Sequence, residues 1–96
     1  MINTPWGRAQ HSNNIARGIT FYSTASHGGF KLSDTRRLEM PSPFREEDTW
    51  AGGNWYEEDC DSALVIYCFP QFFPENQVKA AENMLRSYKP HLMKDK

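Results

Sequence analysis

The sequence predicts an α+β fold, in which a short antiparallel β-sheet packs against two or three helices. Residues 19–24, ITFYST, concentrate the β-branched and aromatic side chains that are typical of a strand. Apolar residues recur at helical spacing through residues 75–89, near the end of the chain. The 96 residues suffice for one hydrophobic core, so we expect a single domain over residues 1–96.

Composition places the chain among ordinary folded proteins. Charged residues make up 24% of it, the net charge is −1, and no run approaches the roughly 20 apolar residues that cross a bilayer. The amino-terminal segment has no apolar signal core, so we expect a cytoplasmic protein that does not contact membranes. Cys60 and Cys68 would lie about 12 Å apart on one helix. We therefore expect two thiols rather than a disulfide.

The amino-terminal region is expected to form a turn and a short strand. Trp6 lies between Pro5 and Gly7, a pattern typical of a turn that places an indole against the core. Residues 7–12, GRAQHS, can pair with the hairpin as a third, shorter strand.

A β-hairpin is predicted over residues 19–32. Gly18 marks its start, and GFKLS returns antiparallel to ITFYST. Because glycine tolerates positive φ angles, we expect Gly28 and Gly29 to make the turn.

A short helix is predicted over residues 34–40. Ser33 can accept hydrogen bonds from the free amides of the first turn, and Asp34 suits the positive end of the helix. Leu38 is expected to provide the inward contact, and Pro41 ends the helix.

Residues 57–69 can be interpreted as a buried strand or as a helix, because residues 63–69 are almost all apolar. We favour the helix, since carboxylates are stabilised near the free amides of a helix amino terminus. Four carboxylates lie at that end of the segment: Glu57, Glu58, Asp59 and Asp61. Pro70 ends it.

The final helix, residues 75–89, is predicted from four apolar positions at intervals of three and four residues: Val78, Ala81, Leu85 and Tyr88. Pro74 suits its first turn, and Pro90 closes it. Residues 91–96 are expected to be a frayed tail.

Charge is distributed unevenly. Residues 1–45 carry six basic and two acidic groups, whereas residues 46–61, which we call the acidic segment, carry seven acidic groups and no basic one. Such a segment, beside exposed aromatic residues, can dock a basic surface on another protein. The predicted binding residues are Glu46, Glu47, Asp48, Trp50, Trp55, Glu57, Glu58 and Asp59. A solvated loop followed by a capped helix explains the same charges.

His27 precedes the glycine pair and has two interpretations. It can hydrogen-bond Glu57 or Glu58 and so tie the hairpin to the next helix, with Gly28, Gly29 and Trp6 in structural roles. Alternatively, it can join carboxylates in a metal or acid–base site, because Glu57 and Asp61 share a face if both are helical. No paired cysteine motif or helical histidine pair is present, so no metal and no cofactor is predicted.

Two other chemistries are not expected. Carboxylates on both sides of Cys60 disfavour a thiolate nucleophile. Direct nucleic-acid binding fits poorly with a net charge of −1, although six basic residues could form a modest basic face: Arg8, Arg17, Lys31, Arg36, Arg37 and Arg45. A monomer and a homodimer both remain open.

Several blocks in order, TPWGRAQ, STASHGG and YEEDC followed by an apolar segment ending in FP, resemble a family of uncharacterised domains. That family is carried by proteins of bacterial plasmids, phages and other mobile elements. Matching positions include Trp6, Gly7, Ser23, Thr24, Ser26, His27, Gly28, Gly29, Tyr56, Glu57, Glu58, Asp59 and Cys60. Ser62 departs from the pattern, since relatives often carry a tryptophan there, and this puts local packing in doubt.

The resemblance implies a setting rather than an activity. Small free-standing phage proteins commonly bind host proteins, and CRISPR–Cas effectors are frequent targets. We therefore expect a non-enzymatic binding protein of the host cytoplasm, an anti-CRISPR-like inhibitor of a host defence complex, whose partner presents a basic surface. The alternative is a small metal-dependent hydrolase or nuclease that uses His27 and the carboxylates Glu57, Glu58 and Asp61.

Overall fold

A computed structural model describes residues 2–93 of the chain and confirms the α+β class. Its strands are β1 (Asn3–Thr4), β2 (Gly7–Arg8), β3 (His11–Ala16), β4 (Ile19–Ser23), β5 (Gly28–Leu32) and β6 (Trp55–Glu57). Its helices are α1 (Asp34–Glu39), α2 (Ser62–Cys68), α3 (Glu75–Tyr88) and α4 (Pro90–Met93), with 3₁₀ turns η1 (Phe44–Glu46) and η2 (Pro70–Phe72).

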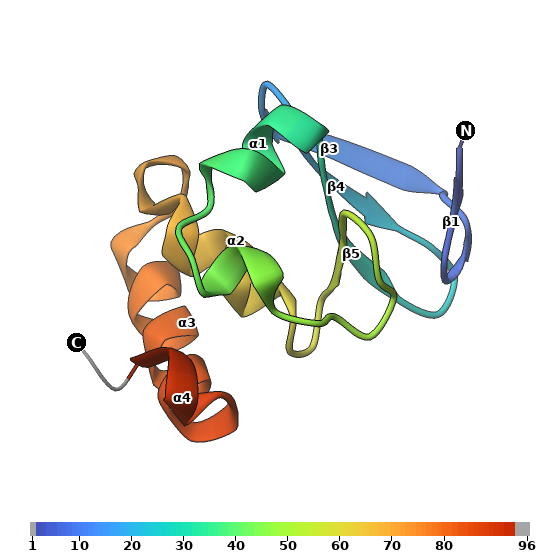
Figure 1. The fold of residues 1–96 in the computed structure, drawn as a ribbon. Helices are drawn as coiled ribbons and strands as arrows, with labels where there is room; N and C mark the ends of the chain where they lie inside the picture. The colour runs from blue at the N-terminus through green and yellow to red at the C-terminus, as the bar shows by residue number, and fades with distance from the viewer. Residues whose placement is uncertain (1, 94–96) are drawn as a thin grey trace.

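Four strands form one antiparallel sheet in the order β3-β4-β5-β6, and β1 and β2 form a separate small hairpin (Figure 1). The predicted hairpin of residues 19–32 is confirmed as β4 and β5. The third strand exists but begins later than expected, because β3 covers His11–Ala16 while Gly7–Arg8 pairs with β1. β3 is an edge strand, and its first four residues are exposed and polar.

The glycine pair does not turn the hairpin, which corrects the sequence prediction. Neither Gly28 nor Gly29 has a positive φ, and both pair within β5. The turn is made by residues 24–27, where Thr24 N–H and Oγ1 both donate to the His27 carbonyl at 2.8 Å. Gly29 is required for a different reason, because a Cβ there would collide with the Trp6 ring and the Tyr56 carbonyl.

The helix predicted over residues 57–69 is shorter, and this is a second correction. Residues 55–57 form β6, which pairs with β5 through Gly29↔Glu57 and Lys31↔Trp55. The helix begins only at Ser62, so the carboxylates that suggested its amino terminus lie in β6 and in the turn that follows. Cys60 and Cys68 are both thiols.

Helix α1 is capped as predicted, since Ser33 Oγ accepts from Arg36 N–H at 3.1 Å. Leu38, however, is 69% exposed, and Met40 just beyond the helix is buried instead. The prediction for Leu38 was wrong because no residue of α1 is buried, and Met40, which follows the helix, makes the core contact instead.

Helix α3 is confirmed, with Ala81 and Leu85 buried and Tyr88 largely exposed. The expected frayed tail is wrong for its first residues, because Pro90 begins α4 and both Leu92 and Met93 are buried. Residues 94–96 lie outside the described residues.

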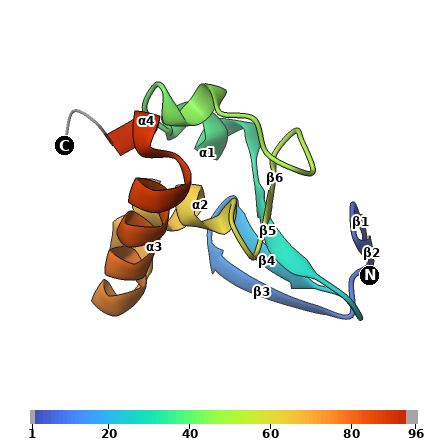
Figure 2. The same ribbon diagram turned by 90° about the horizontal axis from the view of Figure 1, so that it is seen from below.

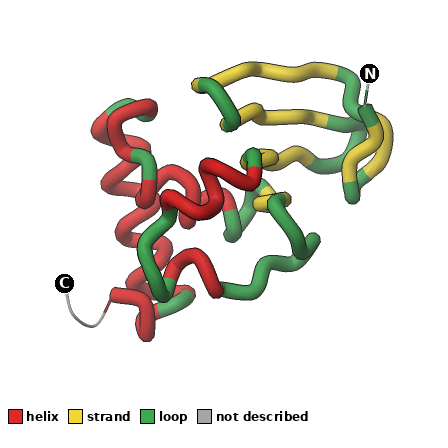
Figure 3. Tube along the Cα trace, turned by 45° about the horizontal axis from the view of Figure 1, so that its top comes forward, coloured by secondary structure: helices red, strands yellow, loops and turns green. Residues whose placement is uncertain are grey.

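The core lies between the inner face of the sheet and the helices, which gather on one side of the molecule (Figures 2 and 3). Its most deeply buried side chains are Ile19, Leu32, Met40, Leu64, Val65 and Leu85. Over residues 2–93, no helix combines the length and apolar character needed to cross a membrane.

Candidate functional site

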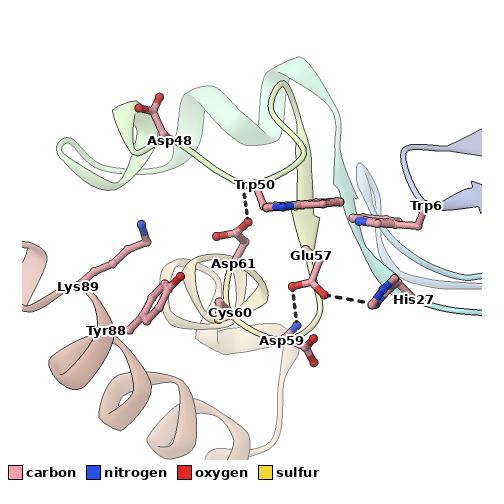
Figure 4. Close-up of a pocket in the computed structure, with 10 residues that line it drawn as sticks. All are labelled: Trp6, His27, Asp48, Trp50, Glu57, Asp59, Cys60, Asp61, Tyr88 and Lys89. Atoms are coloured by element: carbon pink, nitrogen blue, oxygen red, sulfur yellow. Dashed lines mark hydrogen bonds and ion pairs between the residues drawn. The ribbon is translucent and has the colours of Figure 1, made fainter.

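A cavity of about 430 Å³ runs from the amino-terminal hairpin to the carboxyl end of α3 (Figure 4). Its lining residues are Trp6, His27, Asp48, Trp50, Glu57, Asp59, Cys60, Asp61, Tyr88 and Lys89. They come from five separate stretches of the chain, so the cavity exists only in the folded protein. Four carboxylates and two indoles dominate its walls.

Trp6 forms one wall and depends on Gly29. Alternation along β5 and β6 places Phe30 and Tyr56 toward the core and Lys31, Trp55 and Glu57 on the outer face. The Trp6 ring lies over Gly29 on that outer face, with its centroid 5.6 Å from that of Trp55 in an edge-to-face arrangement. The predicted turn is therefore present, but the indole covers the outside of the sheet rather than the main core.

The Trp6 indole nitrogen is buried and has no hydrogen-bond acceptor in the described part of the chain. A buried donor without an acceptor costs about 1–3 kcal/mol, so this wall contains a polar group that the protein leaves unsatisfied.

His27, Glu57 and Asp59 lie together at the sheet end of the cavity. Their ligand atoms are all within 4.8 Å of one another, and His27 Nδ1 is 3.8 Å from Glu57 Oε2 (Figure 4). The Glu57 side chain is only 13% exposed, and its Oε1 accepts from the Asp59 N–H at 2.9 Å. His27 and Glu57 do lie close together, but at 3.8 Å they do not form the predicted hydrogen bond, and Glu57 belongs to a strand rather than to a helix.

The other two predicted carboxylates have structural partners. Glu58 Oε2 accepts from the Gly28 N–H at 3.0 Å, which ties the β4–β5 turn to the loop after β6. Asp61 is buried and accepts from the Trp50 N–H at 2.8 Å, which holds the loop that carries Trp50. Because Glu57 is not helical, the expected shared helix face of Glu57 and Asp61 does not exist.

The first part of the acidic segment is neutralised within the chain. Glu46 accepts from Ser42 and Arg45, and these hydrogen bonds lower the pKa of its carboxyl. Glu47 lies 2.8 Å from Lys89 Nζ and 3.1 Å from His91 Nε2. Burial raises the pKa of Glu47, but the hydrogen bonds from Lys89 and His91 outweigh it, so the pKa is lowered overall.

Asp48 and Trp50 remain available at the rim of the cavity. Asp48 is exposed, and Trp50 is 75% exposed although its backbone is held by Asp61. Trp55, by contrast, is half-buried under Trp6 and Lys31, whose Nζ is 5.3 Å from its ring centroid. Of the two tryptophans predicted to bind, Trp50 is therefore the accessible one.

Tyr88 and Lys89 complete the cavity and were not predicted as site residues. A hydrogen bond with Cys60 raises the pKa of Tyr88. Burial lowers the pKa of Lys89, but the hydrogen bond to Glu47 outweighs it and the pKa is raised. Lys89 lines the cavity, but its charge is paired with Glu47, which does not line it. The four carboxylates of the lining therefore leave the cavity with an excess of negative charge. No local pattern could have placed these residues in the same cavity as Trp6 and His27.

A family model described as a domain of unknown function, DUF7007, matches residues 1–95. Neither the comparison with curated proteins nor the comparison with solved structures found a match.

Proposed function

The chain belongs to the DUF7007 family across nearly its whole length, and on the geometry of its cavity we propose that it binds a basic partner protein. The observation that carries this proposal is a cavity with four carboxylates beside an indole that is 75% exposed. A lysine or arginine side chain of the partner fits such a site, because aromatic faces and carboxylates both attract cations.

Trp50 is the natural anchor of this interface. Exposed tryptophans beside a cavity are typical of binding hot spots, since they bury a large area with little loss of conformational entropy. The Asp61 carboxylate fixes the Trp50 backbone through the 2.8 Å hydrogen bond, which reduces the entropy that binding would cost.

The binding centre is narrower than the whole acidic segment. Glu46 and Glu47 already pair with cations of the same chain, so docking relies on Asp48, Trp50 and Asp59. Both carboxylates are exposed at the cavity, where they can attract a basic surface over several ångströms.

The resemblance to domains of plasmids and phages supports a setting for this activity. In that setting the partner is a host defence protein whose basic surface normally holds nucleic acid, and the chain acts as an anti-CRISPR-like inhibitor. This assignment of the partner rests on analogy with other small mobile-element proteins.

The test separates charge at the cavity from charge elsewhere. A deca-arginine peptide serves as the probe, and Asp48→Lys and Asp59→Lys are compared with Glu39→Lys, a reversal at an exposed residue of α1. Glu39 pairs with Arg36 at the surface, where such a pair contributes little to stability. We expect both cavity variants to weaken binding at least tenfold and the α1 variant to retain most of the affinity. Equal losses of peptide affinity in all three variants would mean that the peptide responds only to the net charge of the protein, and would refute a specific site.

The same variants then serve in pull-downs from host lysate. Reversal of Glu47 is avoided, because breaking its pairs with Lys89 and His91 would confuse lost binding with lost stability. A partner retained by the Glu39→Lys protein and lost by the Asp48→Lys protein supports the proposal.

A second candidate function is that of a metal-dependent hydrolase or nuclease. The observation that favours it is the grouping of His27, Glu57 and Asp59 within one cavity. Glu58 and Asp61 accept hydrogen bonds from the backbone N–H groups of Gly28 and Trp50, so Asp59 takes their place as a ligand in this candidate site. Hydrolysis of a generic phosphodiester that depends on added metal, and that is lost in Glu57→Gln, would establish this candidate.

A further inference from the structure

We propose that His27, Glu57 and Asp59 bind one divalent transition-metal ion, and that Zn²⁺ matches the site best. Within residues 2–93 they form the one group of three such side chains whose ligand atoms all lie within 4.8 Å of each other. The site does not depend on a basic partner. It is a precondition of the hydrolase candidate, but a metal bound here can equally be structural.

The separation of His27 and Glu57 fits a shared ion better than a direct bond. Zinc holds nitrogen and oxygen ligands at about 2.0–2.2 Å, which places two ligands of a tetrahedral site about 3.4 Å apart. His27 Nδ1 and Glu57 Oε2 are 3.8 Å apart, beyond the range of about 2.7–3.2 Å for a hydrogen bond. A shift of a few tenths of an ångström would bring the pair to zinc geometry.

Neighbouring hydrogen bonds orient these groups. Glu57 uses Oε1 to accept from the Asp59 N–H at 2.9 Å, which leaves Oε2 directed at His27. The His27 N–H donates to Thr24 Oγ1 at 3.1 Å, so the turn that carries the imidazole is fixed. Bonds of this kind hold metal ligands in place in known sites. The side chains of His27 and Asp59 are exposed enough to adjust their rotamers.

Charge and ligand type select the class of ion. Two carboxylates and a neutral imidazole supply a charge of −2, which balances a divalent cation. An imidazole ligand favours Zn²⁺ over Mg²⁺ and Ca²⁺, which prefer oxygen donors alone. Three protein ligands also leave the fourth position of a tetrahedral ion for water or another ligand, in a cavity whose lining includes Trp6.

His91 and Glu47 provide an internal control. They also form a histidine–carboxylate pair, but the Lys89 ammonium lies 2.8 Å from the same carboxylate and supplies the positive charge there. A metal ion would have to displace this ammonium, so His91 is not expected to contribute to zinc binding.

The experiment is calorimetric titration of the full chain with Zn²⁺ in a buffer that does not chelate metals. We expect one equivalent to bind, and His27→Ala, Glu57→Gln and Asp59→Asn each to weaken binding at least tenfold, since even outer-shell changes cost about 10–100-fold. His91→Ala should bind as the wild type does. No binding by the wild type, or unchanged affinity in Glu57→Gln, would overturn the site.

A second measurement needs no variant. Co²⁺ added to the ¹⁵N-labelled wild type should broaden amide resonances around residues 27–28 and 57–59 and leave those around His91 sharp. Broadening centred on His91 would show that the metal binds at His91 and Glu47, and would overturn the proposed site. Because neither experiment contains a partner or a substrate, loss of the metal site and loss of peptide binding are distinguishable results.

Discussion

Glu47 and Glu57 each face a histidine, yet the fold treats the two carboxylates differently. Glu47 lies 3.1 Å from His91 and 2.8 Å from Lys89, so two cationic groups satisfy one acid. Glu57 lies 3.8 Å from His27, its Oε1 accepts from the Asp59 backbone N–H at 2.9 Å, and the carboxylate of Asp59 lies within 4.8 Å. A run of acids in sequence is therefore not a single electrostatic feature in space.

The two environments serve different purposes. The Glu47 pairs join the end of η1 to the junction of α3 and α4, and both Glu47 and Lys89 are more than four-fifths buried as side chains. Glu57 is equally shielded from solvent, but no lysine or arginine among the described residues pairs with it. The Glu47 pairs stabilise the fold, whereas the Glu57 group is the one that we propose binds a metal ion.

The largest expected effect on stability comes from the wall of the cavity that Trp6 forms over Gly29. Gly29→Ala should cost about 3 kcal/mol of unfolding free energy, because the new methyl group collides with the Trp6 ring and the Tyr56 carbonyl. Urea denaturation measures this. Gly53→Ala is the matched control, since it meets no neighbour and adds about 1 kcal/mol of backbone strain at φ +59°. Equal costs in the two variants would mean that Trp6 does not depend on Gly29.

Substitution of Glu47, the acid that is paired with two cationic groups, should destabilise the protein less than Gly29→Ala does. Glu47→Gln should cost about 1–2 kcal/mol at pH 7, because Lys89 and His91 lose a charged acceptor. The pKa of Glu47 is below its usual 4.5, so its stabilisation is complete above pH 4.5 and is lost as the pH falls through the lowered pKa. The pKa of Lys89 is above 10.5, so the pair should also lose its stabilisation as the pH rises beyond that value.

Urea denaturation of wild type and Glu47→Gln from pH 3 to pH 8 checks this prediction. The difference in unfolding free energy between wild type and Glu47→Gln should be constant near pH 7 and should shrink toward pH 3. A difference that does not change with pH would contradict the assigned role of the carboxylate. Glu46→Gln is the control at an exposed, neighbouring acid, and its loss should be smaller.

The two histidines allow the comparison to be made directly. His91→Ala should lower the unfolding free energy by a few tenths of a kcal/mol, up to about 1 kcal/mol. His27→Ala in the presence of chelator should lower it less, because the distance from His27 to Glu57 is longer than that from His91 to Glu47. Thermal denaturation of both variants at pH 7 shows which substitution destabilises the protein more. A larger loss for His27→Ala would make the Glu57 group a structural tie and weaken the metal proposal.

The smallest effect on stability is expected at the rim of the cavity. Trp50→Ala should change the unfolding free energy by no more than about 0.5 kcal/mol, because the side chain is 75% exposed. Trp55→Ala should cost about 2 kcal/mol or more, since Trp55 packs against Trp6, Tyr22 and Lys31. If Trp50→Ala destabilises the protein as much as Trp55→Ala, its side chain belongs to the fold rather than to an interface.

Local patterns in the sequence were sufficient for several elements. The spacing of Ala81 and Leu85 predicted α3, Ser33 predicted the cap of α1, and ITFYST predicted β4. Each depends on neighbours within about four residues, which sequence patterns record well. The proximity of His27 and Glu57 was also predicted, although from a wrong element.

The errors arose where a distant segment decided the structure. Residues 55–57 form a strand because β5 offers them an edge. Trp55 and Tyr56 are residue types that favour strands, but three residues are too short a segment to indicate which strand they pair with. The glycine pair was assigned to a turn on propensity, whereas Gly29 is needed for the close approach of Trp6. Tyr88 and Lys89 reach the cavity only through the packing of α3, so no local pattern could reveal them.

The exposed polar strand β3 has a consequence for self-association. An edge strand offers unpaired backbone groups to any other chain, and apolar side chains on such an edge favour aggregation. The exposed residues His11, Ser12, Asn13 and Asn14 supply little apolar surface or β-propensity for such growth. Valine at positions 13 and 14 would raise the apolar character and β-propensity of this edge, so we expect the double variant to aggregate at concentrations at which the wild type does not.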